Sequence, residues 1–117
     1  MKYNKYGNKK TVVDGIKFDS KKEAAYYQEL KLRKRARDII DFELQPKFTL
    51  QPSFKKDGKT IRAITYTADF IVYSDGKTEI VDVKASKFFQ TNVFRIKWKM
   101  LQYKLRNDEG YTLTLFY

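Results

Sequence analysis

The sequence contains no cysteine and no histidine, and these two absences narrow the chemistry that is open to the protein. Without cysteine there are no disulfides, thiol nucleophiles, iron–sulfur clusters or thiolate zinc sites. Without histidine there is no Ser-His-Asp triad, no histidine metal cluster and no imidazole general base. Any catalysis must therefore use carboxylates, lysine, tyrosine, serine or threonine, together with a hard cation bound by oxygen if a metal takes part.

Long apolar runs are lacking as well. None approaches the roughly 20 residues that span a bilayer, so we expect no membrane partner. Met1–Lys10 is polar and has no apolar stretch like that of a secretory leader, which predicts a cytoplasmic protein. The chain of 117 residues shows no linker or repeat, so we predict a single domain over residues 1–117, with residues 1–10 as a loose basic arm.

Positive charge is in excess. The chain has 25 Lys and Arg against 14 Asp and Glu, a formal net charge of +11. A small domain needs a net charge of only about 2–8 to stay in solution, so the excess favours a polyanionic partner, above all nucleic acid. Basic clusters at Lys31–Arg37 and Arg95–Lys99 are each typical of a solvated helix face, but together with the net charge they suggest a phosphate-binding surface. The residues expected to contact nucleic acid are Lys21, Lys22, Lys34, Lys87, Arg95 and Lys97.

Local patterns predict the element order α-β-β-β-α-β, after a short strand at the start. The predicted elements are a strand at Val12–Phe18, a helix that Ser20 caps and that runs to about Arg37, an irregular edge strand within Ile39–Phe54, a long strand at Ile61–Tyr73, a strand at Thr78–Lys84, a helix at about Thr91–Asn107 and a strand at Tyr111–Tyr117. Such an order is typical of a mixed α/β domain.

Ser74-Asp75-Gly76-Lys77 is the strongest hairpin signal in the chain. If Asp75 and Gly76 are the two loop residues, Asp69 stands directly opposite Asp82, with Cβ atoms about 4.5–5.5 Å apart. At an effective dielectric constant of about 20, two such charges repel by about 3 kcal/mol. A sheet tolerates the pair only with a shared proton, a cation or a nearby positive group.

Lys84 lies two residues beyond Asp82 and therefore on the same face of the predicted strand. Two carboxylates can hold a divalent cation, and an ammonium group can position a water or stabilise charge on a phosphate. This combination suits phosphodiester hydrolysis without histidine or cysteine. The alternative is a solvated ion pair of small energetic consequence, but a carboxylate at Asp69, between Ala68 and Phe70, is costly in a strand built for burial.

Glu23 has two interpretations. Ser20 and Glu23 form the S-x-x-E pattern of a capping box, which explains the glutamate without any metal. Alternatively, Glu23 points from the first helical turn towards the sheet and completes a set of metal ligands. From the residues alone the capping interpretation is favoured.

Four short segments, spread over most of the chain, together resemble a known group of enzymes. Phe18–Glu23, Leu44-Gln45-Pro46, Tyr66–Phe70 and Ile80–Lys84 resemble the motifs of the PD-(D/E)xK nuclease superfamily. Within it, the chain is similar to small phage-encoded endonucleases, and more loosely to transposon end-cutting endonucleases and archaeal-type Holliday junction resolvases. The likeness covers nearly the whole chain, although Ala68 stands where the motif's name has proline.

The resemblance implies a restriction-endonuclease-like core with a mixed central sheet flanked by helices. It also implies a Mg²⁺-dependent endodeoxyribonuclease acting on duplex or branched DNA, with Mn²⁺ as a substitute, in a bacterial host if phage-encoded. Asp69, Asp82 and Glu23 would bind the metal with the Val83 carbonyl, and Lys84 would position the water. So small a domain would dimerise or act on two-fold symmetric DNA. Two alternatives stay open: a non-catalytic nucleic-acid-binding module, and a phage protein that binds a host protein through its basic face.

Overall fold

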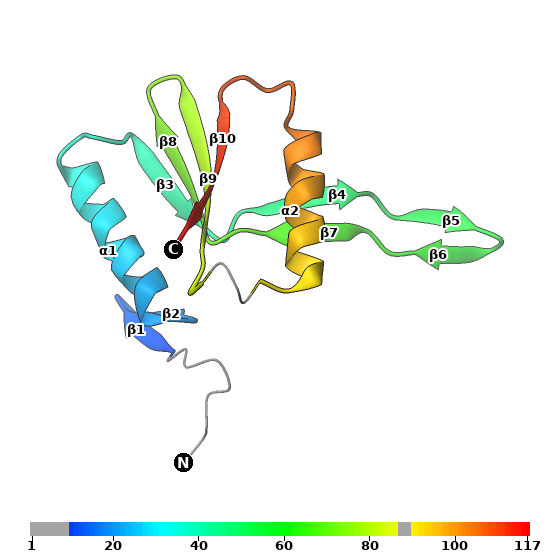
Figure 1. The fold of residues 1–117 in the computed structure, drawn as a ribbon, viewed down its shortest axis with the longest axis horizontal. Helices are drawn as coiled ribbons and strands as arrows, with labels where there is room; N and C mark the ends of the chain where they lie inside the picture. Colours follow the sequence, from blue (N-terminus) through cyan, green and yellow to red (C-terminus); the bar gives the residue numbers. More distant parts are fainter. Residues whose placement is uncertain (1–9, 87–89) are drawn as a thin grey trace, which may run out of the picture.

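The central feature of the fold is a four-stranded mixed sheet with a helix on each face. The computed structural model describes residues 10–86 and 90–117 (Figure 1). In this part of the chain the sheet has the order β10-β9-β8-β3, with β10 parallel to β9 and the other neighbours antiparallel. Its strands are β3 (Asp41–Leu44), β8 (Phe70–Ser74), β9 (Lys77–Val83) and β10 (Tyr111–Phe116). The predicted mixed α/β class is thus confirmed.

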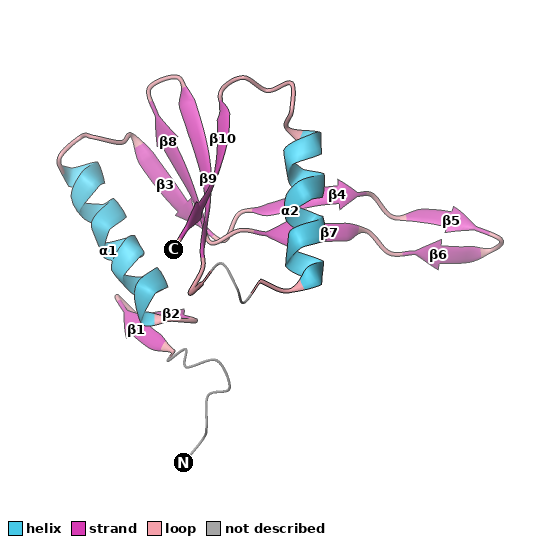
Figure 2. Ribbon diagram, in the orientation of Figure 1, coloured by secondary structure: helices cyan, strands magenta, loops and turns pink. Residues whose placement is uncertain are grey.

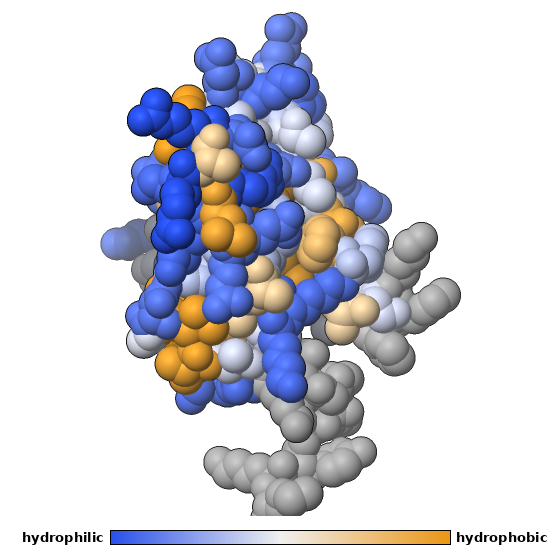
Figure 3. All heavy atoms as spheres, turned by 90° about the vertical axis from the view of Figure 1, so that its left-hand side faces the viewer, coloured by the Kyte–Doolittle hydropathy of each residue, from blue (hydrophilic) through white to orange (hydrophobic). Residues whose placement is uncertain are grey.

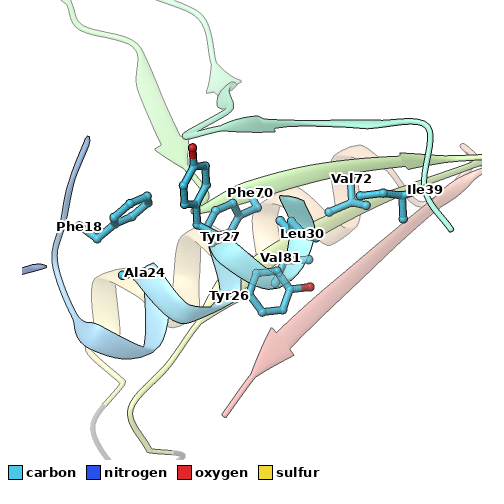
Figure 4. Packing of buried hydrophobic residues seen from close by; sticks show 9 residues of the cluster. All are labelled: Phe18, Ala24, Tyr26, Tyr27, Leu30, Ile39, Phe70, Val72 and Val81. Carbon is cyan, nitrogen blue, oxygen red and sulfur yellow. The ribbon is translucent and has the colours of Figure 1, made fainter. Parts of the chain in front are cut away.

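The two helices, α1 (Lys21–Arg35) and α2 (Asn92–Lys104), cover opposite faces of this sheet. Successive residues of a strand point to opposite faces of the sheet. Phe70 accordingly packs with Leu30 of α1, as Figure 4 shows, whereas Ile71 packs with Leu101 of α2. The helices end at Arg35 and Lys104, slightly before the predicted ends.

The β8–β9 hairpin has the predicted register. Phe70 pairs with Val81 and Ser74 with Lys77, around a loop of Asp75 and Gly76. A two-residue loop fixes which residues face each other, and Gly76 in this loop has a positive φ of 68°, which glycine adopts without steric cost.

The predicted strand at Val12–Phe18 is wrong, because it is two strands. β1 (Thr11–Val13) and β2 (Ile16–Phe18) pair as a hairpin beside the start of α1. Asp14 and Gly15 form its turn, with positive φ values of 53° and 76°. An Asp-Gly pair between two apolar runs is a strong hairpin signal, and the prediction of a single strand did not take it into account.

The irregular edge strand predicted within Ile39–Phe54 is three separate strands, and the long strand predicted at Ile61–Tyr73 is also interrupted. Beyond β3 the chain leaves the sheet as β4 (Lys47–Gln51) and β5 (Phe54–Lys56), then returns as β6 (Lys59–Ile61) and β7 (Ile64–Thr67). β4 pairs with β7 and β5 with β6, and together they form an arm that passes under α2 and projects beyond it (Figure 2).

Backbone geometry explains where the arm departs. Gln45 has a positive φ of 51° and is followed by Pro46, a combination that cannot continue a regular strand. On the returning side, Tyr66 and Ala68 pack in the same cluster as Ile71, so the alternation of faces changes at the bend between them. No helix in the described part of the chain is long and apolar enough to cross a membrane.

Candidate active site

Asp82 and Lys84 lie at the end of β9, at the edge of the sheet where α1 and α2 begin (Figure 1). Lys84 Nζ is 3.5 Å from Asp82 Oδ1. Asp82 is only 5% exposed, and burial raises the pKa of its carboxyl to about 6, although the Lys84 ammonium acts in the opposite direction. The two residues therefore form a largely desolvated pair, in contrast to a solvated surface ion pair.

The Lys84 ammonium is held from a second side by an aromatic ring. Its Nζ lies 3.4 Å from the centroid of the Phe94 ring, which α2 supplies. A cation over an aromatic face is attracted by the ring quadrupole, and more strongly where water is excluded. The Lys84 backbone N–H also donates to the carbonyl of Phe116 at 2.7 Å, which holds the segment beside β10.

Asp69 does not stand opposite Asp82 in the ladder, so this prediction is wrong. The regular pairing ends at Phe70 and Val81, and Asp69 occupies the bend that precedes β8. Its N–H donates to the Val81 carbonyl at 3.2 Å, and its Oδ2 accepts from the Val83 N–H at 2.7 Å. The carboxylate thus bonds to the residue between Asp82 and Lys84 and is anchored beside them.

Burial raises the pKa of the Asp69 carboxyl, while the hydrogen bond from Val83 and the charge of Lys84 lower it. The backbone of Asp69 is fixed on its other side by the Gln45 N–H, which donates to the Asp69 carbonyl at 2.9 Å. The break between the arm and the sheet thus positions this carboxylate.

Glu23 combines parts of both interpretations. Its N–H donates to Ser20 Oγ at 3.1 Å, as a cap requires. Its side chain, however, is 5% exposed, and its pKa is raised to about 7, first by burial and then by the charges of Asp69 and Asp19. Capping explains the backbone but not the burial of a carboxylate close enough to Asp69 and Asp82 to sense their charges.

Tyr66 of β7 is a site residue that the sequence patterns did not single out. Its hydroxyl donates to Asp82 Oδ2. Its ring packs in the core against Trp98. The available signal was chemical, since a buried phenol needs a hydrogen-bond partner.

The carboxylates of Glu23, Asp69 and Asp82 are the type of ligand that a hard cation binds, but they do not surround a common position. Among the residues that the structure describes, no three acidic side chains gather closely enough to hold a metal ion. Glu23, Asp69 and Asp82 offer only oxygen donors, the type that Mg²⁺ prefers. Burial raises the pKa of all three, and nearby negative charges add to this at Glu23, which is the unfavourable electrostatics that a divalent cation relieves. The chemistry of these donors thus fits a hard cation, although the described side chains are not gathered around one position.

Two of the lysines predicted to contact nucleic acid lie in the first turn of α1, close to this site. Lys21 is exposed. Lys22 is half-buried, and its Nζ donates to the Lys84 carbonyl at 3.2 Å and lies 5.3 Å from the centroid of the Phe116 ring. Lys22 therefore adds a second ammonium group beside the end of β9.

The other predicted contacts are dispersed. Arg95 is exposed on α2, and Lys97 lines a shallow groove between α2 and β7. Lys34 lies near the far end of α1 and pairs with Asp41 at 2.9 Å. The side of the molecule on which α1 lies is mainly hydrophilic, with some apolar patches (Figure 3). Lys87 and residues 1–9 of the predicted basic arm lie outside the described residues.

Comparison with known proteins gives a family but no activity. A family model described as a protein of unknown function (DUF1064) matches residues 3–114, so the chain belongs to this family. The match includes both helices and the candidate residues from Glu23 to Lys84. No curated protein and no solved structure matches the chain.

Proposed function

We propose that this member of the DUF1064 family is a metal-dependent DNA endonuclease that uses Mg²⁺, with Mn²⁺ as a substitute. The observation that carries the proposal is the desolvated Asp82–Lys84 pair, with the carboxylate of Asp69 bonded to the residue between them. A carboxylate and an ammonium group on one strand, beside a second buried carboxylate, can hold a hard cation and an anionic substrate at the same place.

The fold supports the same proposal. The sheet and helices follow one another as α1-β3-β8-β9-α2-β10, with one helix on each face of a mixed sheet. We propose that this is a restriction-endonuclease-like core into which the β4–β7 arm is inserted. The net charge of +11 supports a polyanionic substrate.

Each residue of the site has a distinct role in this proposal. Asp69 and Asp82 hold the metal, and Glu23 completes its ligands from α1. A bound Mg²⁺ supplies Lewis-acid stabilisation of the charge on the phosphate. The Lys84 ammonium orients the attacking water and stabilises negative charge that develops on the phosphate oxygens. Tyr66 orients the Asp82 carboxylate through its hydrogen bond and is therefore a positioning residue.

Cleavage of supercoiled plasmid and of a synthetic four-way junction, each with Mg²⁺, Mn²⁺ or EDTA, tests the proposal. Asp82→Asn and Lys84→Ala should abolish metal-dependent cutting. The matched controls, Asp75→Asn and Lys77→Ala, change exposed residues at the opposite end of the same hairpin and should cut like the wild type.

The outcomes separate the candidate functions. Metal-dependent cutting that both site variants lose supports the nuclease, and a preference for the junction supports a substrate with two-fold symmetry or a dimeric enzyme. No cutting with either metal, but retained salt-sensitive DNA binding, would overturn the nuclease in favour of a non-catalytic binding module.

A further inference from the structure

The outer part of the arm, the β5–β6 hairpin, has no core of its own. Every residue from 52 to 63 is exposed, and Figure 1 shows the hairpin projecting beyond α2 into solvent. An isolated two-stranded hairpin is at best marginally stable in water, because it buries little apolar surface. A segment of this kind contributes little to the stability of the domain, and its exposed surface is open to a binding partner.

The hairpin is strongly basic. Its only acidic residue is Asp57 in the turn, and its basic residues are Lys55, Lys56, Lys59 and the adjoining Arg62. Lys56 and Lys59 are direct partners in the register. Like charges directly opposite each other destabilise a strand pair. An anion between the two ammonium groups would remove this repulsion.

The same face of the hairpin carries an apolar pair. Phe54 and Ile61 are register partners and are 43% and 40% exposed. Alternate residues of a strand share a face, so Phe54 and Ile61 lie next to the Lys56–Lys59 pair on one side of the ribbon. Two ammonium groups beside two apolar side chains match the phosphates and the sugar and base edges of a nucleic acid.

The dimensions of the arm suit duplex DNA. The major groove of B-DNA is about 12 Å wide and admits a two-stranded β-ribbon, whereas the major groove of double-stranded RNA is too narrow for side chains to read. The arm starts beside the candidate site, where the Ala68 N–H donates to the Pro46 carbonyl at 3.0 Å. Eight residues separate Lys59 at the tip from Thr67, where β7 ends beside the site. At a strand rise of about 3.3 Å per residue this is a distance of roughly 25 Å, the length of seven to eight base pairs of duplex DNA.

We propose that the β5–β6 hairpin is a DNA-binding arm that enters the major groove of duplex DNA somewhat less than one helical turn from the site of cleavage. The inference rests on the nucleic-acid partner in the proposed function, but not on catalysis. Lys56 and Lys59 contact backbone phosphates, and Phe54 and Ile61, which lie next to this pair on the same face, contact the groove.

Lys56→Glu is the sharpest test, because binding and folding respond in opposite directions. The new glutamate faces Lys59 and replaces a repulsive pair by an attractive one, so the hairpin itself is stabilised. The control, Lys17→Gln with Lys77→Gln, lowers the net charge by the same amount at exposed positions outside the arm. Binding of a labelled duplex is measured by fluorescence anisotropy in EDTA over a range of salt concentrations.

The expected result is a loss of affinity of about tenfold or more for Lys56→Glu. The slope of log K against log salt should fall by about 2, because Lys56 is lost and the new glutamate neutralises Lys59, so that two phosphate contacts are lost. The control should lose no more than about threefold. A double-stranded RNA of equal length should bind the wild type more weakly, and Lys56→Glu should narrow that difference.

Three results would overturn the proposal: unchanged affinity of Lys56→Glu, an equal loss in the control, or a change in oligomeric state that shows the hairpin to be an interface between copies of the chain. Light scattering on the same samples measures the last of these. Because the assay contains no divalent metal, a wild type that binds through the arm but never cuts DNA would refute the nuclease and leave the arm in place.

Discussion

Replacing Glu23 by glutamine should stabilise the metal-free protein above neutral pH, although glutamate is the residue that a helix start normally favours. The Glu23 carboxyl is 5% exposed, and its pKa is raised from 4.5 to about 7. The folded chain therefore binds this proton more tightly than the unfolded chain does. The stability that the protonated carboxyl contributes is complete below pH 4.5 and is lost as the pH rises through 7.

The magnitude follows from the shift in pKa. At about 1.4 kcal/mol per pKa unit, ionising Glu23 in the folded state lowers the free energy of unfolding by about 3 kcal/mol. Glutamine resembles the protonated carboxyl and does not ionise. Glu23→Gln should therefore exceed the wild type by up to about 3 kcal/mol at pH 8, or roughly 10 °C in Tm, and differ little from it near pH 4.5.

Urea and thermal unfolding in EDTA at both pH values measure this effect. Glu29→Gln is the matched control, since Glu29 is exposed on the same helix and its replacement should change the free energy of unfolding by less than about 0.5 kcal/mol. A loss of stability in Glu23→Gln that is equal at both pH values would refute the reasoning, because it would mean that the side chain serves only as a cap.

Two further predictions concern the neighbouring carboxylates. Tyr66→Phe removes the hydroxyl that donates to the buried Asp82 carboxylate, so urea unfolding at pH 7 should show a free energy of unfolding lower by about 1–3 kcal/mol. The exposed Tyr103→Phe is the control and should lose almost nothing. Equal losses in the two variants would mean that this hydrogen bond does not stabilise the fold. Mg²⁺ at about 100 times its Kd should raise the free energy of unfolding of the wild type at pH 8 by about 2.7 kcal/mol, which thermal unfolding measures as a higher Tm. Asp69→Asn should remove most of this gain. A wild-type Tm that Mg²⁺ leaves unchanged would contradict the metal site.

The hairpin register was predictable from the sequence, whereas the interruption beside it was not. The turn at Asp75 and Gly76 fixes the pairing of β8 with β9, because loop length alone determines which residues face each other. The alternation of apolar residues, however, runs on through Ala68 and Asp69 without proline or glycine. The strand is interrupted at Asp69 because the facing chain bends at Gln45, whose N–H donates to the Asp69 carbonyl. A bend imposed by a neighbouring strand cannot be predicted from the local sequence pattern.

The candidate site shows the same division. Asp82 and Lys84 were placed on one face by strand periodicity, and the structure keeps them there at 3.5 Å. The two interpretations of Glu23 could not be separated from the sequence, because S-x-x-E serves a cap and a buried carboxylate equally well, and only burial distinguishes them. The contacts of Tyr66 and Phe94 join three different elements, so periodicity within one element could not predict them.

The way in which the acids are distributed along the chain also determines how the site assembles during folding. Asp69 and Asp82 flank one tight turn, and a hairpin of this kind forms in about 1–10 μs. Glu23 comes from far earlier in the chain and reaches them only when α1 docks on the sheet, a non-local step with a larger loop-closure cost. The negative charges of the hairpin oppose this step at high pH. The same carboxylates that would hold a metal in the folded protein should therefore slow the docking of α1 in the absence of one.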